Sequence, residues 1–466
     1  MTRSEVLTQL SNHFDDGTFL DDLTRRVAIK TESQVPASHP LLRSYLVDEI
    51  APVLRGLDYE VQVFDNPVAG GGPILVARRI EGSDLPTVLT YGHGDVVRGL
   101  DDEWADGLDP WKLKRVGDRL YGRGTADNKG QHSVNLAALA AVIDVRGQLG
   151  FNSTIMLETS EEIGSPGLKE FCEQNLELLS ADVLIASDGP RLDASRPTLY
   201  LGTRGAINFD FSLELRDGGH HSGNWGGLLA NPGIVMANAL ASIVDSHGKV
   251  LLRDLVPDSI PTSVKKALAD CEFEPTTGPT IDHGWGEPGL TTAEKVFGWN
   301  TFEILAFRTG NPDNPVNAIP PRATAACQIR YTVDTDPKTF LPAIRRHLDD
   351  NGFGQIEVSE TYEGVSWAAT RMDPDHPWVK WVADSVERSL GIRPALLPNL
   401  GGSLPNDVFA HTLGLATIWV PHSYSACSQH APDEHALVEV LAEGLQMMGG
   451  IFWDMGESPV PHEYSV

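Results

Sequence analysis

Short apolar runs alternate along the chain with stretches whose apolar residues recur at helical spacing. The runs predict strands at 87–91, 153–157, 182–186 and 416–420. The helical spacing predicts helices at 130–145, 378–390 and 434–453. Strands that alternate with helices are typical of an α/β domain.

The middle of the chain has a different pattern. Residues 207–215 (INFDFSLEL) and 323–332 (ATAACQIRYT) alternate apolar and polar side chains, as half-buried antiparallel strands do. Gly- and Pro-rich loops and a predicted helix at 232–243 lie between them. We therefore expect a second α/β domain at 207–366, inserted into a first domain that consists of 1–206 and 367–466.

Residues that bind hard or borderline metals follow the predicted strands of the first domain. They are His93 and Asp95 after the first strand, Glu161 and Glu162 after the second, and Asp188 after the third. Asp127 lies in a Gly-rich turn before a helix, and His430 lies in the loop before the last helix. Because ligands gather beyond the carboxyl ends of strands in open α/β sheets, we expect these segments to converge.

This set of side chains predicts a metal site. Two histidines and three carboxylates suit two divalent ions that share one carboxylate, and nitrogen and oxygen ligands indicate zinc, with manganese or cobalt as alternatives. One glutamate of the Glu161–Glu162 pair can bind metal while its neighbour holds the proton of an attacking water. Asp95 shares a face with His93 in an extended chain, so it can orient the imidazole.

Composition narrows the class of protein. The 466 residues are 41% hydrophobic, which is enough for a sizeable core and excludes collagen-like and disordered chains. With 36 basic and 64 acidic residues, the net charge is −28. So acidic a protein repels phosphate backbones and anionic lipid surfaces, and we expect neither a nucleic-acid nor a membrane partner.

Cysteine usage and the first residues bear on location. The four cysteines are scattered and form no CxxC pair, which predicts neither a disulfide framework nor a thiolate zinc site. The first twenty residues lack the apolar core of a secretory signal, and no run approaches the roughly 18 apolar residues of a membrane span. We expect a cytoplasmic protein.

Five segments together resemble the motif set of the M-twenty metallopeptidases. They are GHGDVV, YGRGTADNKG, ETSEEIGSPG, ASDGP and HAPDE, and the resemblance extends from His93 to Glu434. The family includes carnosinase-type dipeptidases, acetylornithine deacetylase, succinyl-diaminopimelate desuccinylase, aminoacylase and carboxypeptidase G. The resemblance implies an aminopeptidase-like catalytic domain, with a mixed sheet between helices and a di-metal site at strand ends. It also implies that the inserted α/β domain is a lid that carries a homodimer contact.

The resemblance implies a role for each residue of the expected site. One ion would be held by His93 and Asp188 and the other by Glu162 and His430, with Asp127 bridging the two. The Asp127–Asn128 peptide bond would be cis. Glu161 would be the general base, and Asp95 would orient His93.

Segments of the inserted domain resemble the carnosinase branch in particular. In that branch the histidine of an HSG segment reaches into the active site of the partner subunit and stabilises the oxyanion; here it is His221. Segments that bind the substrate carboxylate match Asn317, Arg330, Gly401, Gly402 and Ser403, with Arg204 as a further contact. The alternatives are a structural ion pair for Arg330 and a simple turn for Gly401–Ser403.

The sequence thus predicts a di-metal amidohydrolase that cleaves a dipeptide or similar small peptide with a free carboxylate. The alternative is an N-acyl-amino-acid deacylase, or a hydrolase of a carbamoyl or other small amide, with the same machinery. Two features leave that alternative open: carnosinases carry two acidic residues where this chain has Asp127 and Asn128, and HAPDE is closer to the deacylase and peptidase branches than to the carnosinase ending. A non-catalytic metal protein is a third class, which the presence of Glu161 argues against.

Overall fold

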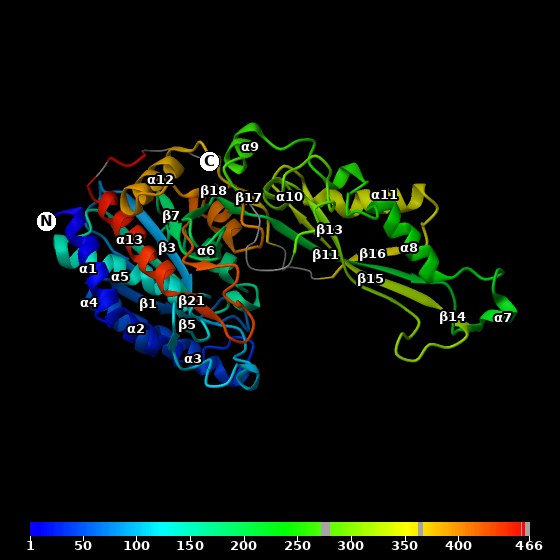
Figure 1. Cartoon of the computed structure of the whole chain (residues 1–466), viewed down its shortest axis with the longest axis horizontal. Helices are drawn as coiled ribbons and strands as arrows, with labels where there is room; N and C mark the ends of the chain where they lie inside the picture. The colour runs from blue at the N-terminus through cyan, green and yellow to red at the C-terminus, as the bar shows by residue number, and fades with distance from the viewer. Residues whose placement is uncertain (272–279, 362–366, 458, 462–466) are drawn as a thin grey trace.

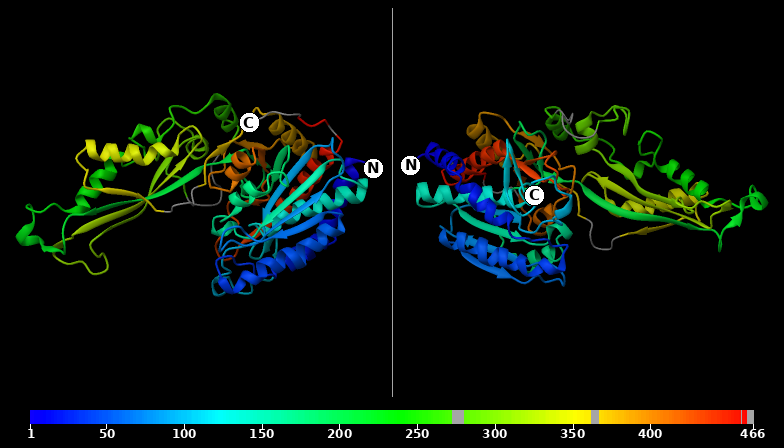
Figure 2. Two further views of the ribbon diagram at one scale, coloured as in Figure 1. Left: turned by 180° about the vertical axis from the view of Figure 1, so that it is seen from behind. Right: turned by 60° about the horizontal axis from the view of Figure 1, so that its bottom comes forward.

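The computed structural model describes residues 1–271, 280–361, 367–457 and 459–461. The chain forms an elongated molecule with a large lobe that contains both termini and a small lobe that projects from it (Figure 1). The two further views in Figure 2 show the same separation, with the small lobe extending away from the large one.

A mixed eight-stranded sheet forms the centre of the large lobe. In spatial order its strands are β1 (Glu60–Phe64), β2 (Ile74–Arg79), β6 (Asn152–Glu158), β3 (Thr87–His93), β7 (Val183–Ala186), β19 (Ala416–Trp419), β9 (Thr198–Tyr200) and β18 (Ala395–Leu397). The four central strands, β6, β3, β7 and β19, run parallel. Their carboxyl ends therefore meet at one edge of the sheet.

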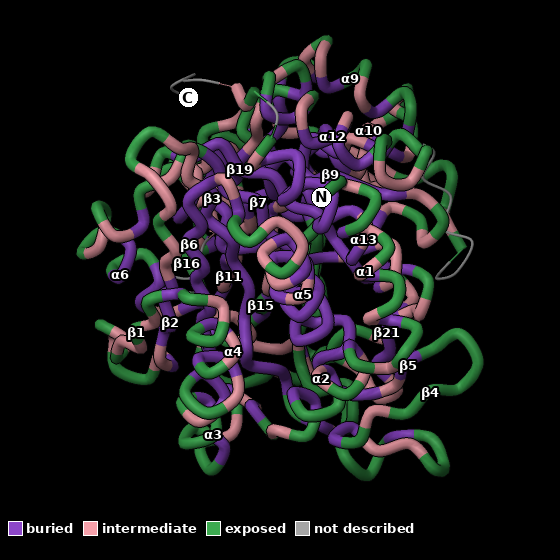
Figure 3. The backbone as a smooth tube through the Cα atoms, turned by 90° about the vertical axis from the view of Figure 1, so that its left-hand side faces the viewer, coloured by how far each residue is buried: buried purple, intermediate pink, exposed green. Residues whose placement is uncertain are grey.

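Both faces of this sheet are covered, which explains why its central strands are nearly continuous apolar runs. On β7, Val183 and Ile185 pack into one core cluster, while Leu184 and Ala186 pack into another on the opposite face. Figure 3 shows β3, β7 and β19 running through the buried interior. Helices that contribute to the first face are α1 (Arg3–Asp15), α2 (Thr18–Val27), α4 (Ala51–Gly56), α5 (Lys129–Arg146), α12 (Pro377–Leu390) and α13 (Val438–Met455), and α6 (Leu168–Gln174) contributes to the second.

The small lobe is built on a four-stranded antiparallel sheet. Its order is β13 (Thr301–Thr309), β15 (Arg322–Tyr331), β11 (Gly205–Glu214) and β16 (Glu357–Glu360). Alternate residues of β11 are buried, and Phe209 and Phe211 pack in a core that includes side chains of α8 (Pro232–Ile243) and α11 (Phe340–Asp350). The half-buried alternation in the sequence is the result of this one-sided cover.

Two strand segments connect the lobes. The chain enters the small lobe through β10 (Gly202–Thr203) and returns through β17 (Thr370–Arg371), and these two strands pair with each other. The remaining short elements are α3 (His39–Ser44), α7 (Ser222–Trp225), α9 (Thr262–Leu268), α10 (Thr292–Phe297), β4 (Lys114–Val116), β5 (Arg119–Tyr121), β8 (Pro190–Arg191), β12 (His220–His221), β14 (Ala318–Ile319), β20 (Ser423–Tyr424) and β21 (His435–Leu437).

The predicted elements are confirmed, with one difference at the last helix. The sequence pattern extends that helix back to residue 434, whereas α13 begins at Val438. His435–Leu437 instead form β21, which pairs with β5. Glu434 is buried and accepts hydrogen bonds from other segments, so a helical first turn does not form there.

Two further expectations concern cysteines and membranes. All four cysteines, Cys172, Cys271, Cys327 and Cys427, are buried free thiols. Within the described part of the chain, no helix combines the length and the hydropathy that a bilayer crossing requires.

Candidate active site

The predicted metal-ligating segments converge at the carboxyl edge of the central parallel strands. His93 is the last residue of β3, and Asp188 lies two residues beyond the end of β7. Glu161 and Glu162 form a short 3-10 turn just after β6. Because these three strands are adjacent and parallel, their ends bring the three segments together.

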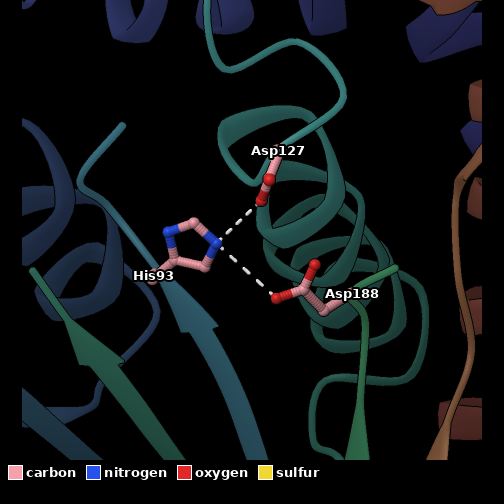
Figure 4. Close-up of side chains that lie close together, drawn as sticks. All are labelled: His93, Asp127 and Asp188. Carbon is pink, nitrogen blue, oxygen red and sulfur yellow. Dashed lines mark hydrogen bonds and ion pairs between the residues drawn. The ribbon is translucent and has the colours of Figure 1, made fainter. Parts of the chain in front are cut away.

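Three of the predicted ligands form a compact buried group. His93 Nε2 lies 2.9 Å from Asp127 Oδ1 and 3.5 Å from Asp188 Oδ2, and all three side chains point toward one another (Figure 4). Asp127 immediately precedes α5 and is followed by a cis peptide bond to Asn128, as the family resemblance implies. One ligand atom from each residue lies within 4.8 Å of the others, a spacing that suits one metal ion.

A second group lies on the other side of Asp127. His430 Nε2 is 3.0 Å from Asp127 Oδ2 and 3.1 Å from Glu162 Oε2. These three residues again offer ligand atoms within 4.8 Å of one another. Asp127 thus contributes a different carboxylate oxygen to each group, which is the arrangement that a bridging ligand requires.

The charges of this cluster call for a cation. Asp188 Oδ2 and Glu162 Oε1 are buried, and neither accepts a hydrogen bond from a described residue. Burial raises the pKa of Glu162 to about 7 and the pKa of Asp188 to about 6. Since an unpaired carboxylate is costly to bury, the donor set fits divalent metal with nitrogen and oxygen ligands.

Asp95 connects the histidine to the paired glutamates. Its Oδ1 lies 3.4 Å from His93 Nδ1, and its main-chain oxygen lies 3.1 Å from the same nitrogen. Its two carboxylate oxygens also accept hydrogen bonds from the main-chain N–H groups of Glu161 and Glu162, each at 3.1 Å. This second contact was not expected from the sequence, and it positions the turn that carries both glutamates.

The side chain of Glu161 lies beside the ligand groups, with Oε2 4.0 Å from His93 Nε2. It lines the cavity beside the two ligand groups but belongs to neither of them. Burial raises the pKa of Glu161 well above its usual range, and the neighbouring carboxylates add to the effect. A carboxyl group with a raised pKa, next to a metal site, is suited to accept and return a proton.

The active-site cavity has a volume of about 520 Å³ and extends from the ligand groups to the small lobe. At its far end lie Arg330, Gly402 and Ser403. Arg330 Nη1 donates to Ser403 Oγ at 2.8 Å and Nε donates to Gln328 Oε1 at 2.9 Å. Arg330 has no carboxylate partner among the described residues, which argues against the structural ion pair considered as an alternative.

Three of the predicted substrate contacts, Arg204, Gly401 and Asn317, are not among the described residues that line this cavity, and neither is His221. Arg204 is turned to the back of the 400–403 loop, where its guanidinium donates to the Gly401 carbonyl. His221 and Asn317 are both exposed. They lie close together because β12, which contains His221, pairs with β14, which directly follows Asn317, at the far end of the small lobe (Figure 1). Nearly the whole length of β15 separates Asn317 from Arg330, so these two residues do not meet within one chain.

Sequence reasoning missed several residues that the fold brings to the site. Gln429 Nε2 donates to Asp127 Oδ2, and Trp367 forms an apolar wall of the cavity with Leu400 and Leu404. These residues follow no recognisable spacing. The position of Gln429 directly before His430 was the one sequence feature that could have identified it.

Glu434 is the most informative of the missed residues. Its Oε1 accepts hydrogen bonds from the main-chain N–H groups of Gly124, Ala126 and Asp127 at 3.0, 3.0 and 3.1 Å. Its Oε2 forms a buried ion pair with Arg123 at 2.6 Å. Glu434 therefore joins the loop of His430 to the turn of Asp127, and the HAPDE segment contains the only sequence hint of this role.

Fold and site together define a metal-dependent hydrolase, with a base beside two carboxylate–histidine groups at the strand ends of an α/β sheet. The chain belongs to peptidase family M20/M25/M40, whose model matches residues 89–454. It is therefore a metallopeptidase that hydrolyses peptide bonds and uses divalent metal.

Curated relatives and solved structures cover nearly the whole chain. A Beta-Ala-His dipeptidase of Mus musculus is 26% identical over an alignment of 496 positions, which covers 99% of this chain and 98% of the relative. A Cys-Gly metallodipeptidase of Candida albicans is 24% identical and covers 94% of this chain and 95% of its own length. The crystal structure of human carnosine dipeptidase 1 matches with a TM-score of 0.75 at 23% identity, over 98% of this chain and 99% of that one.

Proposed function

We propose that this protein is a dipeptidase that hydrolyses small peptides with a free carboxylate, using two divalent ions per subunit. The observation that supports the proposal is that one cavity is lined both by Glu161 with four of the metal ligands and by Arg330 with Ser403. A substrate carboxylate bound by Arg330 and the loop residues Gly401, Gly402 and Ser403 would place the preceding peptide bond near Glu161. The named relatives are dipeptidases, which agrees with a substrate of this size.

The residues divide the chemistry between them. Divalent ions, zinc or else manganese or cobalt, would polarise the scissile carbonyl and lower the pKa of water when bound. His93, Asp188 and Asp127 would hold one ion, and Glu162, His430 and Asp127 the other. Glu161 would take a proton from the attacking water and return it to the leaving amine.

The proposal includes a homodimer, because an apolar strand edge in the small lobe lies open. β13 is the first strand of its sheet, and Ile304, Leu305 and Phe307 on it are 44%, 59% and 43% exposed. An exposed edge with apolar side chains is normally covered by another chain. A second copy is the simplest occupant, since a two-fold axis pairs such a strand antiparallel with itself.

The register of β13 with β15 indicates which parts of two subunits this pairing would bring together. Thr301 of β13 pairs with Arg330 at the cavity end, whereas Thr309 pairs with Ala323 at the far end. Antiparallel self-pairing of β13 would bring the far end of one small lobe to the cavity end of the other. The partner subunit's His221 and the partner subunit's Asn317 would then complete the site, with His221 stabilising the oxyanion.

Two other expectations remain part of the proposal. We assign 1–206 and 367–466 to the catalytic domain and 207–366 to the lid and dimer domain. We also place the protein in the cytoplasm, a reducing compartment in which four buried free thiols are stable.

A hydrolysis screen tests the proposed activity. Protein stripped of metal and reloaded with zinc, manganese or cobalt is assayed on dipeptides, β-alanyl dipeptides included, and on N-acetyl, N-succinyl and N-carbamoyl amino acids. Dipeptides should be cleaved and the acylated amino acids should not. Cleavage of only the acylated compounds would assign the protein to the deacylases and leave the roles of the metal ligands unchanged.

A further inference from the structure

The loop that would receive the substrate carboxylate is attached to the strand that leads into the small lobe. Leu400 N–H donates to the Gly202 carbonyl at 2.8 Å, and Arg204 N–H donates to the Leu400 carbonyl at 3.2 Å. Ser403 Oγ donates to the Arg204 carbonyl at 2.9 Å. The position of the loop therefore depends on the connection between the lobes.

The side chain of Arg204 adds a second attachment from behind the loop. Its Nε and Nη2 both donate to the Gly401 carbonyl oxygen, at 3.0 and 2.8 Å. Arg204 is only 9% exposed, and its Nη1 is buried without a partner among the described residues. Arg204 lines a separate cavity of about 470 Å³ beside α10 and is not among the described residues that line the active-site cavity.

The geometry of the Gly401–Gly402 peptide determines where its N–H group points. A trans peptide is planar, with its C=O and N–H pointing in opposite directions. When Arg204 holds the Gly401 carbonyl, the N–H of Gly402 in the same peptide is directed to the other side. Gly402 lines the active-site cavity, and no described residue accepts a hydrogen bond from its N–H.

We propose that Arg204 is a positioning residue: it fixes the Gly401–Gly402 peptide so that the Gly402 N–H, with Ser403 and Arg330, binds the substrate carboxylate. The inference rests on the proposed function, because it needs a substrate with a free carboxylate. It replaces the direct substrate contact expected from the sequence with an action through the loop.

The positive charge of Arg204 and the close packing around Gly401 support this role. Burial and the nearby Arg330 guanidinium lower the pKa of Arg204 to about 10, so Arg204 stays cationic at neutral pH. A neutral residue would not hold the carbonyl as firmly, because hydrogen bonds from charged donors are the stronger ones. A Cβ at Gly401 would lie 3.2 Å from Val296 Cγ1, so glycine lets the loop pack closely against α10.

The test compares a dipeptide with its C-terminal amide, which lacks the carboxylate. In Arg204→Met, kcat/KM for the free acid should fall about tenfold through KM, while kcat/KM for the amide should hardly change. Arg204→Lys, which keeps the charge but loses the planar fork of two donors, should lie between the two and serves if Arg204→Met does not fold. Arg55→Met removes an exposed arginine of α4 and should leave both values unchanged.

A double-mutant cycle with Ser403→Ala separates action through the loop from direct contact. If Arg204 acts through the loop, the losses of Arg204→Met and Ser403→Ala should combine to much less than their product. Losses that multiply, or equal falls for acid and amide, would overturn the inference. Wild-type protein that cleaves no dipeptide would instead refute the proposed function, so the two failures are distinguishable.

Discussion

The large lobe buries several of its candidate functional residues, whereas the far end of the small lobe exposes its own to solvent. In the large lobe, His93 and Asp127 are buried, and each contacts other charged side chains of the same chain. At the far end of the small lobe, His221 and Asn317 are exposed. The first set is complete because adjacent parallel strands end at one sheet edge. In the proposed function, the second set acquires its chemical role when a partner subunit is placed against it.

In the proposed dimer, one chain holds a nearly complete reaction centre and depends on a second copy for the rest. Metal ligation and proton transfer need residues fixed to within fractions of an ångström, which a buried sheet edge provides. Oxyanion stabilisation from the lid can come from a surface that docks later.

Loss of the base should have the largest effect and should be confined to the large lobe. In Glu161→Ala, kcat should fall by about 10²–10⁴-fold, because no other described group in the cavity is placed to take the proton. Bound metal should remain at the wild-type level, since Glu161 belongs to neither ligand group. Steady-state kinetics and metal analysis measure both, with the exposed Glu177→Ala as the control. Near wild-type turnover in Glu161→Ala would remove this residue from the mechanism.

Loss of Glu434 should weaken the large lobe itself. Glu434→Ala leaves the buried Arg123 guanidinium without its counter-ion and frees three main-chain N–H groups. The free energy of unfolding should fall by about 3–5 kcal/mol, as for other buried ion pairs that lose one member. Denaturant unfolding measures the loss, and Glu439→Ala, an exposed change at the start of α13, is the matched control. Equal stability of the two variants would show that Glu434 does not join the two segments.

A charged residue on the exposed edge strand β13 should disrupt the proposed dimer without unfolding the small lobe. Leu305→Asp should shift the molar mass in solution from dimer to monomer and lower activity, since the partner subunit's His221 is then absent. Thermal stability of the monomer should be little changed because Leu305 is 59% exposed. Ile80→Asp, at a site 53% exposed on the large lobe, is the control for light scattering and activity. A Leu305→Asp protein that stays dimeric would place the interface elsewhere.

The same residues show which parts of the site could be predicted from the sequence alone. His93, Glu162 and Asp188 could be found because they stand at or shortly after the ends of apolar strands, and strand direction then determines where their side chains meet. Asp127 and His430, in a turn and a loop, could be found only from the motif segments that contain them. The role of Glu434 could not be found, since it depends on hydrogen bonds to main-chain groups about 310 positions away in the chain. The same limit applies to the start of α13, where pairing of β21 with β5 replaces the helical turn that periodicity predicts.

Contacts that need two surfaces were the hardest to place. Asn317 and Arg330 occur in one short segment of sequence, yet Asn317 precedes β14 at the far end of the small lobe and Arg330 lies near the other end of β15. Arg204 carries the charge of a substrate contact, but its side chain is committed to the Gly401 carbonyl. Neither outcome follows from residue type or spacing, because both depend on strand length and on which side of a loop a side chain lies.

The central claim is that the large lobe of one subunit and the small-lobe end of another form one active site. The direct test mixes Glu161→Ala and His221→Ala subunits, each nearly inactive alone, and measures dipeptide hydrolysis after subunit exchange. Each mixed dimer has one site with Glu161 and the partner subunit's His221 intact, so activity should recover toward about a quarter of wild type. No recovery, with exchange verified by labelled subunits, would contradict the shared site.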